Sequence, residues 1–305
     1  LYRTGKLRKI GRVDHGDTAL DTHTLERERG ITIFASQAVF STDKIEVTLL
    51  DTPGHVDFSS ETERTLSVLD YAILVISGLD GVQSHTLTLW KLLKLYNVPT
   101  FVFVTKMDFA RKSREEIIEN LNSELDGEFV DFGDEEAVSE NMALCSESLM
   151  EKYLSGEEID EKEIAEAIKL RKIFPCFFGS GLKLDGIDKF IKALEEYTIQ
   201  PEYPEVFGAK VFKISHDSQG VRLTHIKVTG GSIKVREMIG DEKISGIRIY
   251  SGAKFTTADE VGSGEICALT GLDKTHNGQG LGFEDAGEKP TLEPVMNYRV
   301  VLPDG

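Results

Sequence analysis

The sequence lacks long hydrophobic runs and contains little cysteine, proline or tryptophan. Its 305 residues include 3 cysteines, 8 prolines and 1 tryptophan. No apolar run is long enough to span a membrane, and the first residues do not have the pattern of a secretion signal. The cysteines are odd in number and form no C-x-x-C motif, which indicates reduced core thiols and not disulfides or zinc ligands. We therefore expect a cytoplasmic globular protein with no membrane partner.

Positive charge is also scarce. The chain has 35 Lys and Arg residues against 52 Asp and Glu residues, a net charge of −17 at pH 7. Such a chain is a poor non-specific ligand for nucleic acid, so we do not expect DNA as a partner. A local basic patch would still permit contact with a large ribonucleoprotein. The length is enough for two domains or slightly more.

Two hydrophobic periodicities divide the chain. Up to about residue 198, short β-rich runs alternate with helical runs, and the apolar runs 71–76 and 100–104 are typical of parallel strands buried on both faces. This pattern predicts an α/β, doubly wound domain. After residue 204 the period changes to two, which predicts a small antiparallel β-barrel. The domains we assign are 1–203, then the barrel at 204–290, then the start of a third domain at 291–305.

Three shorter segments carry predictions about single elements. Residues 31–40 alternate loosely in polarity, as a half-exposed strand would. Asp185 is predicted to be the N-cap of the helix that follows it. Residues 147–172 form an acidic helical stretch interrupted at Gly156, which we interpret as a solvated surface insertion.

The most informative motif is Asp51-Thr52-Pro53-Gly54-His55, at the end of the apolar run 47–50. An Asp at the carboxyl end of a buried strand can hold a Mg²⁺-bound water, and the Gly N–H can point at a γ-phosphate. His55 follows where a group that orients an attacking water is needed. Taken alone, the same residues also fit an ordinary turn after a strand.

Three further motifs fall where a guanine-nucleotide site requires them. Thr105-Lys106-Met107-Asp108 ends a buried run, and a carboxylate there can accept both N1–H and the 2-amino group of guanine. Gly179-Ser180-Gly181 ends the next run, where a backbone N–H can reach the guanine carbonyl. Arg29-Gly30-Ile31-Thr32 lies upstream, and its Thr hydroxyl can ligate Mg²⁺. Their order, each beside a strand end, predicts a site for GTP or GDP with Mg²⁺.

These motifs resemble those of the translational GTPases. Within that family the chain is most similar to the tetracycline-resistance ribosomal protection proteins, which are similar to elongation factor G. The segments that carry the likeness are 21–32, 66–82, 149–156 and 208–214. The resemblance implies a P-loop-NTPase-type GTPase domain followed by a translation-factor β-barrel, in a monomeric protein that binds the ribosome through rRNA and ribosomal proteins.

The resemblance also implies roles for single residues. Asp51 and Thr32 would serve Mg²⁺, Gly54 would sense the γ-phosphate, and His55 would position water. Ile31 would be half of an apolar gate beside that water. The residues implied to bind the nucleotide are Asp51, Thr52, Pro53, Gly54, His55, Thr105, Lys106, Met107, Asp108, Ser180 and Gly181.

The phosphate-binding loop is where the chain departs from the family. Residues 11–18 match the family pattern G-H-V-D-H-G-K-T at six of eight positions, but Asp17 would set a carboxylate against the triphosphate. Residues 6–10 are too polar for a buried central strand, so we assign this region to the first switch segment. We expect the first strand and the loop to be absent, which leaves two apolar strands with unpaired edges. The lost phosphate contacts would cost about 5 kcal/mol or more.

Two functions stay open at this stage. One is a GTPase of translation, either a tetracycline-resistance factor or a protein like elongation factor G, which would be inactive in this chain without the loop. The alternative is a truncated ribosome-binding module without nucleotide turnover. A second departure, Thr105 in place of the family's Asn, is expected to weaken nucleotide binding because a hydroxyl makes fewer bonds than an amide.

Overall fold

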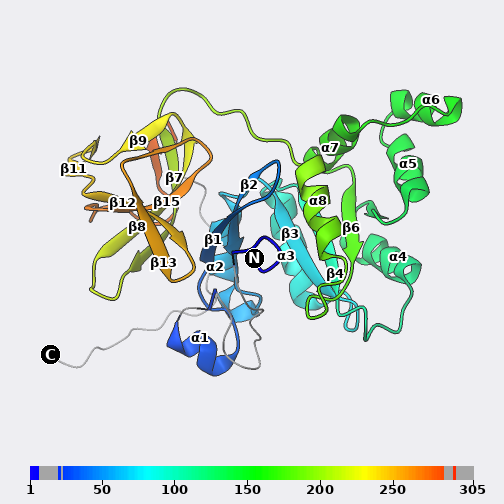
Figure 1. The fold of residues 1–305 in the computed structure, drawn as a ribbon, viewed down its shortest axis with the longest axis horizontal. Helices are drawn as coiled ribbons and strands as arrows, with labels where there is room; N and C mark the ends of the chain where they lie inside the picture. The colour runs from blue at the N-terminus through cyan, green and yellow to red at the C-terminus, as the bar shows by residue number, and fades with distance from the viewer. Residues whose placement is uncertain (7–19, 22, 285–290, 293–305) are drawn as a thin grey trace. The chain divides into compact units, whose positions relative to one another are not determined.

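The computed structural model describes residues 1–6, 20–21, 23–284 and 291–292 (Figure 1). The loop-like segment 11–18 and nearly all of the predicted third domain lie outside the described residues. The described residues form two compact units. The first contains 1–6, 37–49 and 66–203, and the second contains 20–36 without residue 22, 50–65, 204–284 and 291–292. The predicted domain boundaries stay a prediction.

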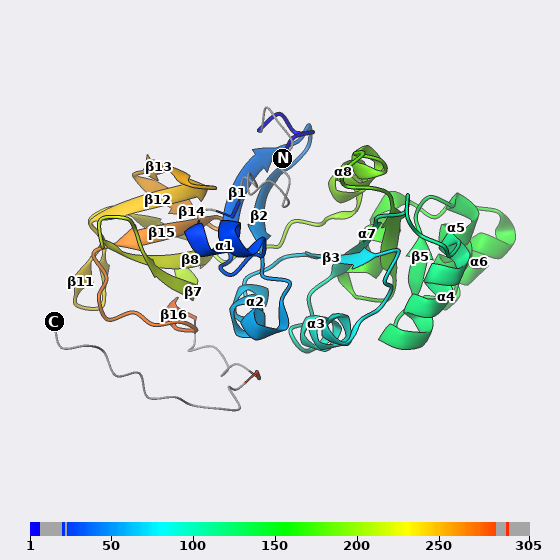
Figure 2. The ribbon, with the colours of Figure 1, turned by 90° about the horizontal axis from the view of Figure 1, so that it is seen from below.

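The first unit is built on a four-stranded parallel sheet of order β3-β4-β6-β5. Its strands are β3 (Ala72–Ser77), β4 (Thr100–Thr105), β5 (Phe129–Asp131) and β6 (Phe174–Phe178). Its helices are α3 (Ser84–Leu95), α4 (Arg114–Leu125), α5 (Glu135–Ala143), α6 (Glu147–Ser155), α7 (Glu161–Lys169) and α8 (Ile187–Tyr197). Figure 2 shows α3 and α8 on opposite sides of the sheet. The predicted α/β, doubly wound architecture is confirmed.

Alternation along the central strand explains this two-sided cover. Phe101 and Phe103 of β4 belong to one buried cluster with Ile168 of α7 and Phe190 of α8. Because successive side chains of a strand point to opposite faces, Val102 and Val104 face the other side. All five residues of β6 are buried as well, as continuous apolar strands of a covered parallel sheet should be.

Strand β3 lies at the edge of this sheet among the described strands. Among the described strands, β3 pairs with β4 alone, whereas β2 (Glu46–Asp51) pairs with β1 (Ser36–Ser41) in a separate two-stranded sheet. On β3, Leu74 and Ile76 are buried, but Val75 on the opposite face is 61% exposed. Natural sheets usually avoid an apolar strand whose backbone edge is unpaired and whose side chains are exposed on one face.

Two predicted element ends are wrong and one is confirmed. The strand expected at residues 31–40 begins only at Ser36, because residues before it bond to a buried carboxylate described below. Asp185 is not the N-cap of α8; that position is Gly186, with a φ of 75°, a left-handed conformation that glycine adopts without strain. The acidic stretch is indeed two helices, and α6 ends at Gly156 in the left-handed conformation.

The second unit contains a six-stranded antiparallel sheet of order β13-β12-β15-β8-β7-β16 and the short pairs β9-β14 and β10-β11. Its strands are β7 (Gly208–His216), β8 (Arg222–Gly230), β9 (Ser232–Lys234), β10 (Met238–Ile239), β11 (Glu242–Lys243), β12 (Gly246–Ser251), β13 (Lys254–Ala258), β14 (Glu260–Gly262), β15 (Ile266–Thr270) and β16 (Gly280–Gly282). Inward-facing residues of these strands, such as Val211, Ile226 and Leu269, form one buried cluster. The predicted antiparallel domain is confirmed.

Three short helices complete the second unit: α1 (Thr24–Arg29), the 3₁₀ helix η2 (Val56–Phe58) and α2 (Ser59–Leu66). Within α2, Glu63 is fully buried and accepts hydrogen bonds from the backbone N–H groups of Thr291 (2.6 Å) and Leu292 (2.9 Å). Within the described part of the chain, none of the helices is long and apolar enough to cross a membrane.

Candidate functional site

The two motifs predicted to bind the base lie side by side in the first unit. Strands β4 and β6 are parallel neighbours, with Val104 opposite Phe178, so the segments that follow them leave the same sheet edge. The Met107 N–H donates to the Gly179 carbonyl oxygen at 3.1 Å, which joins the two loops directly. The structure therefore brings residues 105–108 and 179–181 together, as the sequence predicted.

The loop after β6 closes on itself. Ser180 and Asp185 exchange two backbone hydrogen bonds, of 3.2 Å and 3.1 Å. A Cβ on Gly179 would lie 2.1 Å from the Asp185 carbonyl oxygen, so only glycine fits at this position. The side chain of Ser180 is buried. A closed loop of this kind holds its backbone N–H groups in fixed directions, which a site for a planar base requires.

Asp108 has a partner that the sequence did not indicate. Its Oδ2 lies 3.2 Å from the Nζ of Lys183, in the loop after β6. Desolvation acts to raise the pKa of Asp108, but hydrogen bonds from Lys183 and Ser180 outweigh it, and the pKa lies below its ordinary value. Asp108 is thus held as an acceptor-only carboxylate, the form that can receive two N–H donors from guanine.

Thr105 contributes to the same loop contact. Its hydroxyl oxygen accepts a hydrogen bond from the Gly181 N–H at 3.4 Å, and its carbonyl accepts from Gly78 at 2.8 Å. Lys106 adopts a left-handed backbone with a φ of 59°, which turns the chain between the strand end and Asp108. Thr105 therefore supports the loop through a single side-chain bond, consistent with the limited bonding capacity of a hydroxyl.

The residues predicted to serve Mg²⁺ lie in the second unit, around a buried glutamate. Glu26 is 1% exposed, and its carboxylate accepts from the backbone N–H groups of Ile33 and Phe34, both at 3.0 Å, and of His23 at 2.9 Å. The Ile31 N–H donates to the Glu26 carbonyl oxygen at 3.2 Å. One residue of α1 therefore fixes the backbone on both sides of Thr32.

Thr32 itself is bonded to a carboxylate. Its hydroxyl donates to Asp21 Oδ1 at 2.9 Å. Burial, followed by the charges of Asp21 and Glu26, raises the pKa of Asp51 to about 6. Thr32 and Asp51 thus share one acidic environment in which negative charge is poorly compensated.

A magnesium ion fits the chemistry of this environment. Hard oxygen donors are what Mg²⁺ prefers, and it commonly uses one or two carboxylates together with waters and substrate phosphates. A divalent cation would also relieve the repulsion that raises the pKa of Asp51. No group of three or more His, Cys, Asp or Glu side chains converges as a complete metal site in the described part of the chain. The donors therefore suit an ion that a nucleotide helps to hold.

His55 and Gly54 follow Asp51 at the end of β2. The Nδ1 of His55 accepts a hydrogen bond from the Asp57 N–H at 3.2 Å and so caps η2, while the ring is 46% exposed. With Nδ1 as acceptor, a neutral ring carries its proton on Nε2. A Cβ on Gly54 would meet nothing within 4 Å, so packing in this structure does not require glycine there. Pro53 is buried, and its carbonyl accepts from Thr62 at 2.9 Å.

Three residues of the site were missed by sequence reasoning: Lys183, Asp21 and Glu26. Glu26 had a usable signal, because a polar residue three positions before a Glu is the spacing of a capping box, and His23 and Glu26 form one. Lys183 and Asp21 gave none, since their roles depend on how two loops fold back.

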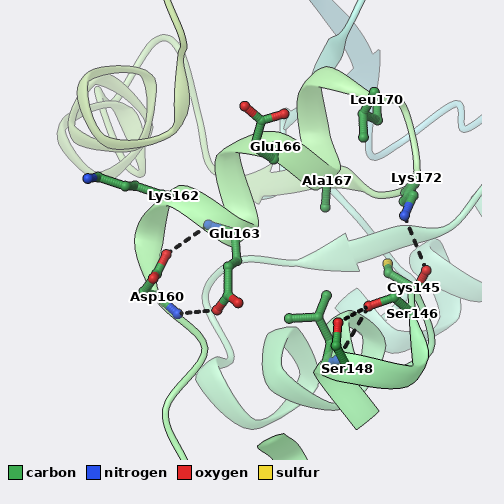
Figure 3. Close-up of a pocket in the computed structure, with 11 residues that line it drawn as sticks. Cys145, Ser146, Ser148, Asp160, Lys162, Glu163, Glu166, Ala167, Leu170 and Lys172 are labelled. Carbon is green, nitrogen blue, oxygen red and sulfur yellow. Dashed lines mark hydrogen bonds between the residues drawn. The ribbon is translucent and has the colours of Figure 1, made fainter. Parts of the chain in front are cut away.

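A separate cavity of about 300 Å³ lies beside α6 and α7 (Figure 3). It contains none of the predicted site residues. Several of the polar groups drawn there already bond to each other: Lys172 Nζ donates to the Cys145 carbonyl at 3.3 Å, and Glu163 accepts from the Asp160 N–H at 3.1 Å. The lining residues are Cys145, Ser146, Ser148, Leu149, Asp160, Lys162, Glu163, Glu166, Ala167, Leu170 and Lys172.

The sequence matches the family described as the elongation factor Tu GTP binding domain over residues 1–200. The chain belongs to this family. Its fold is that of the translational GTPases, with the parallel-sheet domain followed by an antiparallel domain. A solved protein of Thermus thermophilus shares this fold, with a TM-score of 0.82 and 24% identity, over 95% of this chain and 51% of that one.

Several relatives of this chain are tetracycline resistance proteins. TetP of Clostridium perfringens is 32% identical over 317 residues, which cover 93% of this chain and 49% of TetP. TetW of Butyrivibrio fibrisolvens is 33% identical over 295 residues, which cover 88% of this chain and 46% of TetW. The chain spans about half the length of the curated relatives it matches.

Proposed function

We propose that the chain contributes the nucleotide-binding part and the antiparallel domain of a ribosome-stimulated GTPase that protects ribosomes from tetracycline. The observation that carries the proposal is the bond between Met107 and Gly179, which holds the Asp108 loop and the Ser180 loop at one sheet edge. Family membership and the tetracycline resistance relatives support the ribosome as the partner. Membership of the family supports the GTPase reaction, and the tetracycline resistance relatives support protection from tetracycline.

The base would be read by Asp108, with the backbone of Ser180 and Gly181 at the guanine carbonyl. An adenine base offers Asp108 no pair of N–H donors, so the carboxylate would lose its bonds to the base, which is a large penalty against the wrong substrate. Lys183 would keep the Asp108 carboxylate ionised and oriented while the base is absent.

Mg²⁺ would be held by Thr32 and by a water on Asp51, and when bound it would neutralise charge on the phosphates. For Thr32 to face the ion, its hydroxyl must give up its bond to Asp21. His55 would orient the attacking water, and in its present tautomer Nε2 can only donate, so the ring must first leave the η2 cap to accept a proton. Ile31 would exclude bulk water beside it.

The test uses the gene product that contains this chain, assayed for GTP hydrolysis with and without ribosomes. We expect ribosomes to stimulate turnover, and His55→Ala to reduce the stimulated rate by roughly 10²–10⁴-fold while GTP still binds. His276→Ala, an exposed histidine of the antiparallel domain, is the matched control. Normal turnover in His55→Ala would refute the assigned role. Ribosome binding without any turnover in the wild type would favour the non-catalytic module instead.

A further inference from the structure

A lysine of the antiparallel sheet bonds to the segment that carries Thr32. Lys213 lies on β7, and its Nζ donates to the Ala35 carbonyl oxygen at 2.5 Å. The same Nζ lies 3.7 Å from Glu61 Oε1 and 5.8 Å from the centre of the Phe34 ring. Only 15% of the Lys213 side chain and 18% of the Glu61 side chain are exposed. This ion pair is therefore largely shielded from water, unlike a surface pair of small energetic value.

Ala35, Glu61 and Lys213 all contact one another, and we call these three residues the Ala35 cluster. Glu61 Oε1 accepts a hydrogen bond from the Ala35 N–H at 3.4 Å. Glu61 therefore binds the backbone N–H of Ala35, and Lys213 binds its carbonyl oxygen. Ala35 comes three residues after Thr32, and Glu61 comes six residues after His55. The cluster thus ties together the two segments predicted to surround the γ-phosphate.

The strand is shaped to present this lysine. The pairing of β7 with β8 shifts register between Val211 and Lys213, and such a bulge redirects the side chain that follows it. Burial lowers the pKa of Lys213, while the carboxylates of Glu61 and Glu26 act to raise it. Burying a charged lysine destabilises a fold unless the ammonium group is paired or hydrogen-bonded.

We infer that Lys213 is a positioning residue, through which the antiparallel domain sets the placement of the Thr32 segment and of helix α2. This inference rests on the proposed function, because positioning these segments matters only if they contact a nucleotide. The experiment below needs no nucleotide, so the inference and the proposed function can fail separately.

The experiment is hydrogen–deuterium exchange with residue-level resolution on the purified chain. Lys213→Met should speed exchange of the Ala35 amide by about tenfold or more, because the Ala35 carbonyl oxygen loses its bond and Glu61, which accepts the Ala35 N–H, loses its cationic partner. The amides of Ile33 and Phe34, which bond to Glu26, should change less, and amides paired between β8 and β15 should keep their rates. Lys213→Arg should restore slow exchange. Lys210→Met, on the same strand but paired with Glu284 at 3.8 Å and with 43% of its side chain exposed, is the control and should change nothing at Ala35.

An unchanged Ala35 rate in folded Lys213→Met would overturn the inference. Equal acceleration at Ala35 and across β8 and β15 would overturn it too, because the lysine would then only stabilise the sheet. If Lys213→Met does not fold, Glu61→Gln leaves β7 intact, keeps an acceptor for the Ala35 N–H and removes only the charge that pairs with Lys213, and it should also speed exchange at Ala35. An unchanged Ala35 rate there would overturn the inference equally.

Discussion

The buried carboxylate of Glu26 accepts the backbone N–H of Ile33 at 3.0 Å, seven residues further along the chain. This bond, with the neighbouring one from Phe34 and the bond from the Ile31 N–H to the Glu26 carbonyl oxygen, fixes the backbone on both sides of Thr32. The segment predicted to supply Thr32 to Mg²⁺ is therefore ordered here by its own helix α1.

Replacing Glu26 should release this turn. Glu26→Ala leaves the N–H groups of Ile33 and Phe34 without their acceptor, and we expect cleavage by trypsin after Arg27 and Arg29 to become roughly ten- to a hundredfold faster. Glu28→Ala, an exposed neighbour on the same helix, should leave the rate unchanged. Equal cleavage rates in the two variants would show that Glu26 does not hold the turn.

The antiparallel domain should lose stability in acid through His225. Burial, followed by the charge of Lys213, lowers the pKa of His225 to about 3 from 6.5. The unfolded chain therefore takes up a proton that the folded chain refuses, so the contribution is complete above about pH 6.5 and is lost as the pH falls toward about 3. By pH 4 the loss would be about 3 kcal/mol.

The check is the unfolding free energy of wild type and His225→Gln between pH 7 and pH 4. Gln can keep the bond that His225 Nε2 makes with Ser215 Oγ at 2.8 Å, but it takes up no proton. We expect a flatter pH dependence in this variant and a wild-type dependence in the His276→Gln control. Parallel curves for wild type and His225→Gln would contradict the assignment.

The 305-residue chain should bind GDP weakly. The sequence contains no Gly-x₄-Gly-Lys-Ser/Thr motif, so the charge-assisted phosphate contacts of such a loop are missing. Their loss should weaken the free energy of nucleotide binding by about 5 kcal/mol or more. We expect a dissociation constant far above the micromolar range by calorimetry. Micromolar or tighter binding would mean that residues 11–18 act as the phosphate loop after all.

The sequence was sufficient to predict the positions of candidate site residues that depend only on where strands end. Carboxyl ends of parallel strands share one edge, so Asp108 and Ser180 could be placed together from β4 and β6 alone. The sequence was not sufficient where a residue's role depends on loop conformation. Asp185 was predicted to be the N-cap of α8, but Gly186 takes that position and Asp185 closes the Ser180 loop. Lys183 was invisible for the same reason.

Longer-range contacts were equally out of reach. Lys213 and Ala35 are 178 residues apart, and the bulge that presents the lysine leaves no mark in a pattern of period two. The hydrophobic pattern nevertheless located β3 and β4, because continuous apolar runs mark buried strands without revealing their partners.

The measurement that tests the central claim most directly is an NMR titration of the chain with GDP and ADP at millimolar concentrations. If Asp108 and its loop read guanine, GDP should shift the amide signals of residues 105–108 and 179–183, ADP should not, and Asp108→Asn should transfer the preference to the xanthine nucleotide. Equal shifts with GDP and ADP, or an unchanged preference for GDP in Asp108→Asn, would contradict the account.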